Sequence, residues 1–287
     1  MDTNLNAAGR TNADAKKSWN NWRKEVDSAL SEPFGWLTLS ALTWLTKDPS
    51  PIDDFPGTWS FQDGVVHVHF SASEPQIYRV DTGSSPADAS PLPQGQRHTF
   101  DPRESPTLQV ADKQAEIALR NGQVCVRIRN KDSALRAGFT AVPAWPWQAK
   151  WVIPVRYFPY PQAVTRDIFT AWRGLTNKME FCGDVVFRLG DSEVRWAVSG
   201  SSIDEGRVIF RDGTSQSQAA PWRTAPVVEV DADSGDPKYV IDFNYAQNFP
   251  AHYGPWATCP RPVAENYTEV EITAGQKRPL ITQSQWL

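Results

Sequence analysis

The C-terminal third of the chain gathers the residue types of nucleophilic and acid–base chemistry. Asp242, His252 and Cys259 fall within one short stretch. A carboxylate, an imidazole and a thiol are common bases and nucleophiles in enzymes. The segment from residue 242 to residue 266 is polar, Pro-rich and aromatic without a strong strand pattern, and such loops are often functional. We predict that Asp242, His252 and Cys259 are catalytic. The alternative is that Asp242, Asn244 and Asn266 satisfy buried backbone groups and hold the loop in place, and that Cys259 is a buried small residue.

A second group of polar residues could hold a small anionic ligand. Arginine forks bind carboxylates and phosphates through two-point contacts, and Arg127 shares one face of an expected strand with Arg129. The alternative for the arginines is ion pairing with neighbouring acids or plain exposure to solvent. The predicted ligand-binding residues are Arg127, Arg156, Asp212, Arg223, Asn244, Tyr253 and Asn266.

Histidines in the first half of the chain allow a third chemistry. His67 and His69 alternate on an expected strand, so both point the same way, and Glu74 and His98 follow. This order is similar to the cupin motifs, in which three His and one Glu hold a first-row metal, although the flanking glycines are missing. A cupin-like metal enzyme is therefore an alternative. Phosphate-binding glycine loops are absent, and so is the Gly-x-Ser-x-Gly turn of serine hydrolases. Apart from the cupin-like alternative we expect no cofactor.

The elements that would position these residues are mostly strands. Residues 13–30 place Trp19, Trp22 and Val26 on one stripe, which predicts a helix. From about residue 56, short alternating segments are separated by turn residues, and Asp63-Gly64 favours a tight hairpin. We predict a mainly β fold: two consecutive β units form a sandwich or barrel-like body with the N-terminal helix packed on it. Residues 1–12 would be a flexible arm and residues 13–287 a single β-rich domain, with a possible internal division near residue 145.

The composition of the chain argues against two classes of partner, nucleic acids and membranes. The 29 basic and 33 acidic residues give a net charge of −4 without a basic run, which argues against a nucleic-acid partner. Three scattered Cys do not form a disulfide framework, and no signal peptide or membrane-length apolar run is visible. We expect a cytoplasmic protein without a membrane partner; its oligomeric state is not indicated. The 13 Trp residues are of a type that often lines pockets.

The C-terminal third of the chain carries a string of specific motifs: Phe210-Arg211-Asp212-Gly213-Thr214, Asp242-Phe243-Asn244, Ala257-Thr258-Cys259-Pro260-Arg261-Pro262, Glu265-Asn266 and Ala274-Gly275-Gln276-Lys277. This string resembles the domain-of-unknown-function family 1684 (DUF1684). The resemblance covers roughly residues 19 to 280 and implies a β-rich fold without an assigned biochemical role. Ala251 stands where the family has a Cys, which argues against chemistry that needs paired thiols.

Two classes of function fit these patterns. One is a protein that binds a small, anionic metabolite, or a cofactor-independent enzyme of hydrolase, lyase or isomerase type, with its site near the C-terminal loop. There Asp242 or His252 would act as the base, and Arg223 or Arg156 would hold the anion. The other is a non-catalytic binding or scaffold protein, in which the same polar residues are structural.

Overall fold

The structure, a computed structural model, describes residues 11–80, 89–230 and 238–280. Its contacts divide the chain into two compact units, one made of residues 1–27 and 140–287 and the other of residues 28–139. We call them the barrel unit and the inserted unit. Both are built mainly from antiparallel strands, and one long helix lies near the N-terminus. The predicted mainly β fold is therefore confirmed, while the predicted flexible arm falls almost wholly outside the described residues.

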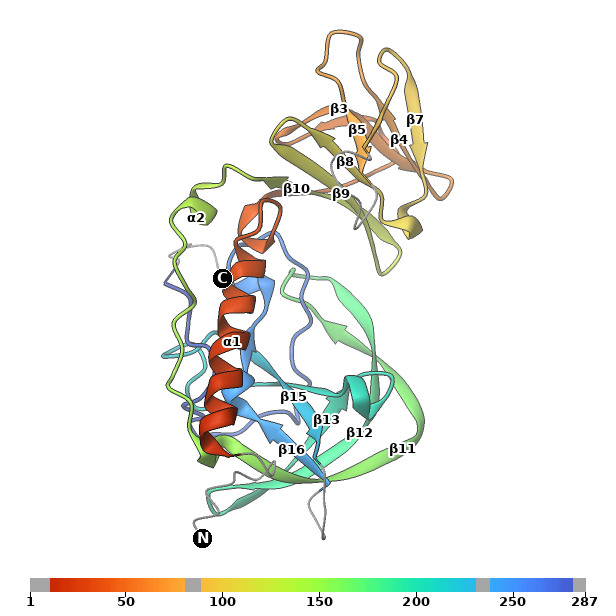
Figure 1. Ribbon diagram of the computed structural model, residues 1–287. Coiled ribbons are helices and arrows are strands. Elements are labelled where there is room, and N and C mark those ends of the chain that lie inside the picture. Colours follow the sequence, from red (N-terminus) through yellow and green to blue (C-terminus); the bar gives the residue numbers. More distant parts are fainter. Residues whose placement is uncertain (1–10, 81–88, 231–237, 281–287) are drawn as a thin grey trace. The chain divides into compact units, whose positions relative to one another are not determined.

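Six strands of the barrel unit close on themselves (Figure 1). They follow the order β14-β13-β12-β11-β16-β15, and β15 pairs back with β14. Closure removes the open edges of the sheet and turns alternate side chains of each strand inward. The strands are β11 (Val152–Phe169), β12 (Thr176–Leu189), β13 (Ser192–Ser199), β14 (Arg207–Phe210), β15 (Arg223–Glu229) and β16 (Tyr239–Asp242).

Aromatic side chains fill the barrel. Trp196 is fully buried and stacks on Phe210, with ring centroids 5.3 Å apart. Phe243 meets both of these rings edge-on. Offset-stacked and edge-to-face contacts of this kind add to the stabilisation that apolar burial provides. The barrel interior is thus a packed core rather than an open channel.

Helix α1 (Asn12–Leu30) contacts the barrel unit along the predicted stripe. The indole Nε1 of Trp19 donates a hydrogen bond to the carbonyl of Asn244 at 2.8 Å. Trp22 lies against Tyr245, with ring centroids 4.9 Å apart. The expected helix is confirmed, because its apolar spacing matches the one face that this unit covers.

After β16 the chain runs to residue 280 with little regular structure; we call residues 243–280 the strap. It contains the short turns η6 (Phe243–Tyr245) and η7 (Pro250–His252), and β17 (Gln247–Asn248), which pairs with β15. Main-chain hydrogen bonds tie the strap to strand ends and loops of the barrel unit at several points. Five of the ten predicted catalytic and ligand-binding residues lie on this segment: Asn244, His252, Tyr253, Cys259 and Asn266.

The inserted unit contains two sheets around one apolar core. The larger has the order β1-β10-β9-β8-β5-β6, and the smaller has the order β2-β3-β4-β7. Asp63 and Gly64 both have positive φ in the turn between β3 and β4, as the tight-hairpin pattern predicts. The strands are β1 (Leu39–Trp44), β2 (Ser50–Ile52), β3 (Phe55–Gln62), β4 (Val65–His69), β5 (Tyr78–Val80), β6 (Ser90–Pro91), β7 (Arg97–Phe100), β8 (Thr107–Val110), β9 (Lys113–Arg120) and β10 (Gln123–Asn130).

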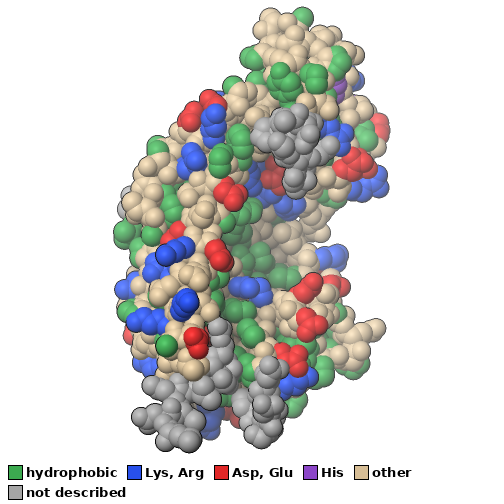
Figure 2. Space-filling view, in the orientation of Figure 1, with side chains coloured by type: hydrophobic (Ala, Val, Ile, Leu, Met, Phe, Trp, Pro, Cys, Tyr) green, Lys and Arg blue, Asp and Glu red, His purple; other side chains and the backbone are tan. Residues whose placement is uncertain are grey.

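The surface carries charges of both signs. On the face that Figure 2 shows, basic and acidic side chains are interspersed over the described residues. None of the helices in the described ranges combines the length and the apolar character needed to cross a bilayer.

Candidate functional site

Arg223 and Asp212, two predicted ligand-binding residues, form a buried ion pair. The guanidinium of Arg223 is 1 % exposed and donates to the Asp212 carboxylate at 2.6 Å. It also donates to the carbonyls of Ile272, Ala274 and Gln276 at 3.0, 2.5 and 3.1 Å. Burial lowers the pKa of Arg223, and the adjacent carboxylate opposes this effect. The arginine fork therefore holds three carbonyl groups of the strap in place.

Asp242 and Asn244 are brought together at the start of the strap. Asn244 is buried, accepts from the backbone N–H of Gln148 at 2.9 Å and donates to the Gln148 carbonyl at 3.0 Å. The Asp242 carboxylate accepts from the backbone N–H and the side-chain amide of Asn244 at 3.0 and 2.8 Å. It thus caps the short turn η6. The pair fixes where the chain leaves β16.

Asn266 plays a similar part on the outside of the barrel. Its side-chain oxygen accepts from the Ala197 N–H at 2.7 Å. Its amide donates to the carbonyls of Ala197 and Ile209, both at 2.9 Å. A buried Asn that satisfies three main-chain groups locks the strap onto β13 and β14.

His252 is buried against the start of β15. Its Nε2 lies 2.9 Å from the carbonyl of Trp222, and since a carbonyl can only accept, Nε2 carries the proton. Burial lowers the pKa of His252 to about 4, so the ring is neutral near pH 7. The neighbouring Tyr253 is also buried; burial raises its pKa, and its hydroxyl donates to the Gln276 side chain at 3.4 Å.

The three predicted catalytic residues lie against different parts of the barrel unit. Asp242 is paired with Val152 at the beginning of β11. Cys259 is half-buried, and its carbonyl accepts from Ala171, just beyond the other end of β11. His252 packs on Trp222, with ring centroids 4.6 Å apart. The 18 residues of β11 separate the positions of Asp242 and Cys259 along the barrel wall.

Arg127 and Arg156 belong to different units, and both form ion pairs. Arg127 is buried on β10, donates to Glu116 and lies over the Trp36 ring, 5.5 Å from its centroid. Arg156 is exposed on β11 and pairs with Glu193 at 3.1 Å. The ion-pair alternative considered for these arginines describes both of them.

The structure does not bring together the four residues of the cupin-like alternative, His67, His69, Glu74 and His98. His67 and His69 lie on one face of β4, but His98 is opposite Val68 and so lies on the other face. The Glu74 carboxylate accepts from the backbone N–H groups of Gly57 and Ser71 at 2.8 and 2.5 Å. Across residues 11–80, 89–230 and 238–280, no group of three or more His, Cys, Asp or Glu side chains could hold a metal ion.

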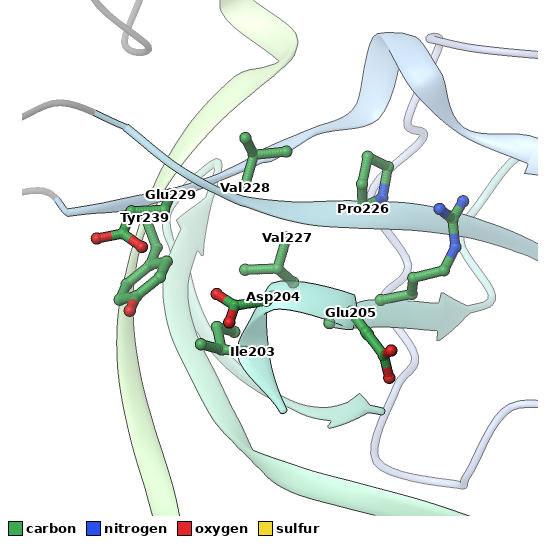
Figure 3. A pocket seen from close by; sticks show the side chains of 10 residues that line it. Ile203, Asp204, Glu205, Pro226, Val227, Val228, Glu229 and Tyr239 are labelled. Atoms are coloured by element: carbon green, nitrogen blue, oxygen red, sulfur yellow. The ribbon is translucent and has the colours of Figure 1, made fainter. Parts of the chain in front are cut away.

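A pocket that the sequence did not indicate opens between η5 (Ile203–Glu205) and the end of β15. Its volume is about 320 Å³. Figure 3 shows Val227 extending from β15 toward η5, which carries Ile203 and Asp204. Ile203, Val227 and Tyr239 also pack on the apolar core, so the pocket lies at the mouth of the barrel. Such mouths are frequent ligand sites.

Arg207 is the basic residue among those that line this pocket. It is half-buried on β14 opposite Pro226, and its Nε donates to the Thr224 hydroxyl at 3.1 Å. Within the described residues its guanidinium has no carboxylate partner, and burial lowers its pKa. An unpaired, desolvated guanidinium costs free energy unless an anion compensates it. Nothing in the spacing of Arg207 distinguishes it from other strand arginines, so pattern analysis missed it.

Comparison with known proteins indicates a family for residues 137–277 but does not indicate an activity. Residues 137–277 match the model of a family described as "Protein of unknown function (DUF1684)". A solution NMR structure of an uncharacterized protein from Haloarcula marismortui is 21% identical, covers 51% of this chain and 81% of that chain, and superposes with a TM-score of 0.41. No curated protein matches. The family match includes Arg207 and the strap as far as residue 277, whereas Arg127 and the histidines of β4 and β7 precede it.

Proposed function

We propose that this chain, whose residues 137–277 belong to the DUF1684 family of unknown function, is a non-catalytic binding protein for a small anionic organic molecule. Its ligand site is the pocket at the mouth of the barrel, and Arg207 is the anion anchor. The observation that carries the proposal is the half-buried guanidinium of Arg207, which lacks a carboxylate partner within the described residues.

The non-catalytic part of the proposal rests on the strap. Most side-chain hydrogen bonds of three motif residues go to main-chain groups; the residues are Arg223, Asn244 and Asn266. Such contacts stabilise the fold and leave little capacity for a substrate. Asp242 and His252 also bond to the backbone. These contacts favour a structural role for the motif residues.

The ligand part rests on the pocket. Its volume of about 320 Å³ is within the range of small-molecule sites, roughly 300–1,000 Å³. Apolar side chains such as Ile203, Val227 and Pro226 line it. Arg207, which lies beside Pro226 and Thr224 on the face of β15 opposite to Val227, provides two-point recognition of a carboxylate or phosphate. The proposed ligand therefore combines an apolar body with an anionic group.

The test uses thermal unfolding with simple anionic probes. Hexanoate, glutarate and phenyl phosphate are added to the wild type, Arg207→Gln and Arg156→Gln, the last of which removes an exposed arginine as a matched control. At least one probe should raise Tm by mass action in the wild type and the control, and this increase should be lost in Arg207→Gln. Equal stabilisation of Arg207→Gln, or no effect of any probe on the wild type, would overturn the proposal.

Catalysis by Asp242, His252 or Cys259 is the competing prediction. The cytoplasmic location and the absence of a nucleic-acid partner also stay predictions. Asp242→Asn keeps an oxygen that can cap η6 but removes the base. If the wild type hydrolyses or isomerises a small metabolite and this variant is inactive with an unchanged Tm, Asp242 is catalytic. A lower Tm with no activity in either protein supports the structural role.

A further inference from the structure

We infer that this protein forms a homodimer in which a free edge of β11 pairs with the same edge of a second copy. The inference goes beyond the proposed function, since it involves neither Arg207 nor the pocket. Its starting point is the unequal length of the strands on the two sides of β11. β16 pairs only with residues 152–155, whereas β12 follows the other side as far as residue 169. Closure of the barrel therefore leaves part of one β11 edge without a neighbouring strand.

A hydrogen bond at the end of β11 shows which main-chain groups face this edge. The N–H of Arg261, on the strap, donates to the Phe169 carbonyl at 2.8 Å, so the main-chain groups of Phe169 face away from β12. Successive residues of a strand direct their N–H and C=O groups to alternate edges. The N–H and C=O groups of Thr165 and Asp167 therefore face the same edge as those of Phe169.

These groups of Thr165 and Asp167 have no partner among residues 11–80, 89–230 and 238–280. The strap pairs with the chain just beyond them, where Pro260 lies opposite Thr170, but its hydrogen bonds do not continue along β11. Both residues are exposed. An exposed row of unpaired N–H and C=O groups is a template for pairing with another strand.

The side chains along this edge fit a second copy of the same edge. Two identical edges pair antiparallel around a two-fold axis. With the axis at Thr165, this residue lies opposite its own copy, Val164 lies opposite Arg166, and Ala163 lies opposite Asp167. Like charges do not meet in this register, and a Thr–Thr pair across two strands is favourable.

The neighbouring registers are less favourable. Moving the axis toward Phe169 places Arg166 opposite Arg166, or Asp167 opposite Asp167, and like charges directly opposite each other are destabilising. Moving it the other way brings in Pro161, which has no N–H to donate to the ladder. The charges and the proline therefore select the register centred on Thr165.

Two exposed apolar side chains lie beside the residues that would pair. Val164 is 44 % exposed and Phe169 is 70 % exposed. In the register centred on Thr165, Val164 packs against the alkyl part of Arg166 of the second copy, and the Phe169 ring reaches Ala163 of the second copy along a diagonal. Burial of this apolar surface stabilises the dimer in addition to the main-chain hydrogen bonds.

The experiment measures the mass of the full chain by sedimentation velocity over about a hundredfold range of protein concentration. The wild type should convert from monomer to dimer as the concentration rises. Thr165→Lys and Thr165→Glu each place like charges opposite each other at the axis, so each variant alone should stay monomeric. An equimolar mixture of the two should recover the dimer, because Lys then lies opposite Glu. Ser192→Lys, at an exposed position of β13, is the matched control and should dimerise like the wild type.

A wild type that stays monomeric over the whole range would overturn the inference. Dimers that persist in Thr165→Lys would also overturn it, since the contact would then lie elsewhere, as would a mixture that stays monomeric although both variants keep the wild-type Tm. Thr165→Pro is a second check that adds no charge. It removes an N–H that faces away from β12, so it should weaken the dimer while the strand stays paired; dimerisation equal to that of the wild type would contradict the edge contact.

Discussion

His252 packs its ring against Trp222 and donates from Nε2 to the Trp222 carbonyl. Its pKa of about 4, below the ordinary value of 6.5, means that the folded protein keeps the ring neutral. As the pH falls below 6.5 the unfolded chain takes up a proton that the folded chain does not, so stability is full above about pH 6.5 and declines toward about pH 4.

The first prediction follows from that linkage. His252→Gln should abolish the part of the acid-side stability loss between about pH 6.5 and 4 that is due to His252, which is on the order of 3 kcal/mol from a shift of two to three pKa units. Urea unfolding across this range measures it. His69→Gln, which removes an exposed imidazole, is the control and should keep the wild-type decline. An identical decline in His252→Gln and the wild type would contradict the burial argument.

The second prediction concerns the buried pair Asp212–Arg223. Asp212→Asn leaves a guanidinium of 1 % exposure without its counter-charge, and breaking a buried pair in this way costs roughly 3–5 kcal/mol. Glu193→Gln breaks the exposed pair with Arg156 and should cost less than about 1 kcal/mol. Chemical denaturation of both variants gives the comparison. Similar small losses would show that Arg223 finds other partners.

At the scale of elements, the strap is held by side chains rather than by long strands. The side chain of Asn266 forms hydrogen bonds with main-chain groups of Ala197 and Ile209, as a neighbouring strand would. Arg223 donates in the same way to the strap carbonyl of Ala274. Asn244 accepts from the backbone N–H of Gln148. A segment without regular pairing must satisfy its buried backbone groups in other ways, and these polar residues do so together with the main-chain hydrogen bonds of the strap.

The third prediction tests one attachment. Asn266→Asp turns a donor of two hydrogen bonds into a carboxylate facing the carbonyls of Ala197 and Ile209. Unsatisfied buried groups cost about 1–3 kcal/mol each, so we expect a loss of at least ~3 kcal/mol and earlier proteolysis within the strap. Asn177→Asp, which removes a single 3.4 Å bond to Thr258, is the matched control. Unchanged hydrogen exchange over residues 263–270 in Asn266→Asp would show that the strap is held elsewhere.

At the scale of the whole molecule, residues 28–139 interrupt the barrel unit. The Asp27 carboxylate accepts from the Val142 N–H at 3.0 Å, and Arg23 donates to the Val142 carbonyl at 3.0 Å. The chain therefore leaves and re-enters the barrel unit at adjoining points. Within the inserted unit, β1 and β10 are the first and last strands and pair with each other. Adjoining ends of this kind are typical of tolerated domain insertions.

The fourth prediction is that a short Gly/Ser linker can replace residues 28–139. The shortened chain should keep a cooperative thermal transition and the near-ultraviolet signal of the packed Trp196 and Phe210 rings. Residues 28–139 expressed alone are the companion sample. Two cooperative transitions would establish two domains. Loss of structure in both pieces would support the prediction of a single domain over residues 13–287.

Local pattern alone was enough for the helix at residues 12–30, the hairpin at Asp63-Gly64 and the mainly β class, because neighbouring residues set backbone preference and periodicity. The C-terminal motif string also indicated the family that matches residues 137–277.

Only the tertiary structure decided which polar groups form hydrogen bonds with one another and which side chains are buried. Asn266 reaches Ala197 across 69 positions, and Arg223 reaches Ala274 across 51. The pocket at Arg207 exists because η5 and the ends of β14, β15 and β16 meet at the barrel mouth. When a barrel closes, it brings together segments that are distant in sequence. The spacing of residues along the chain does not show which polar groups become buried by that closure.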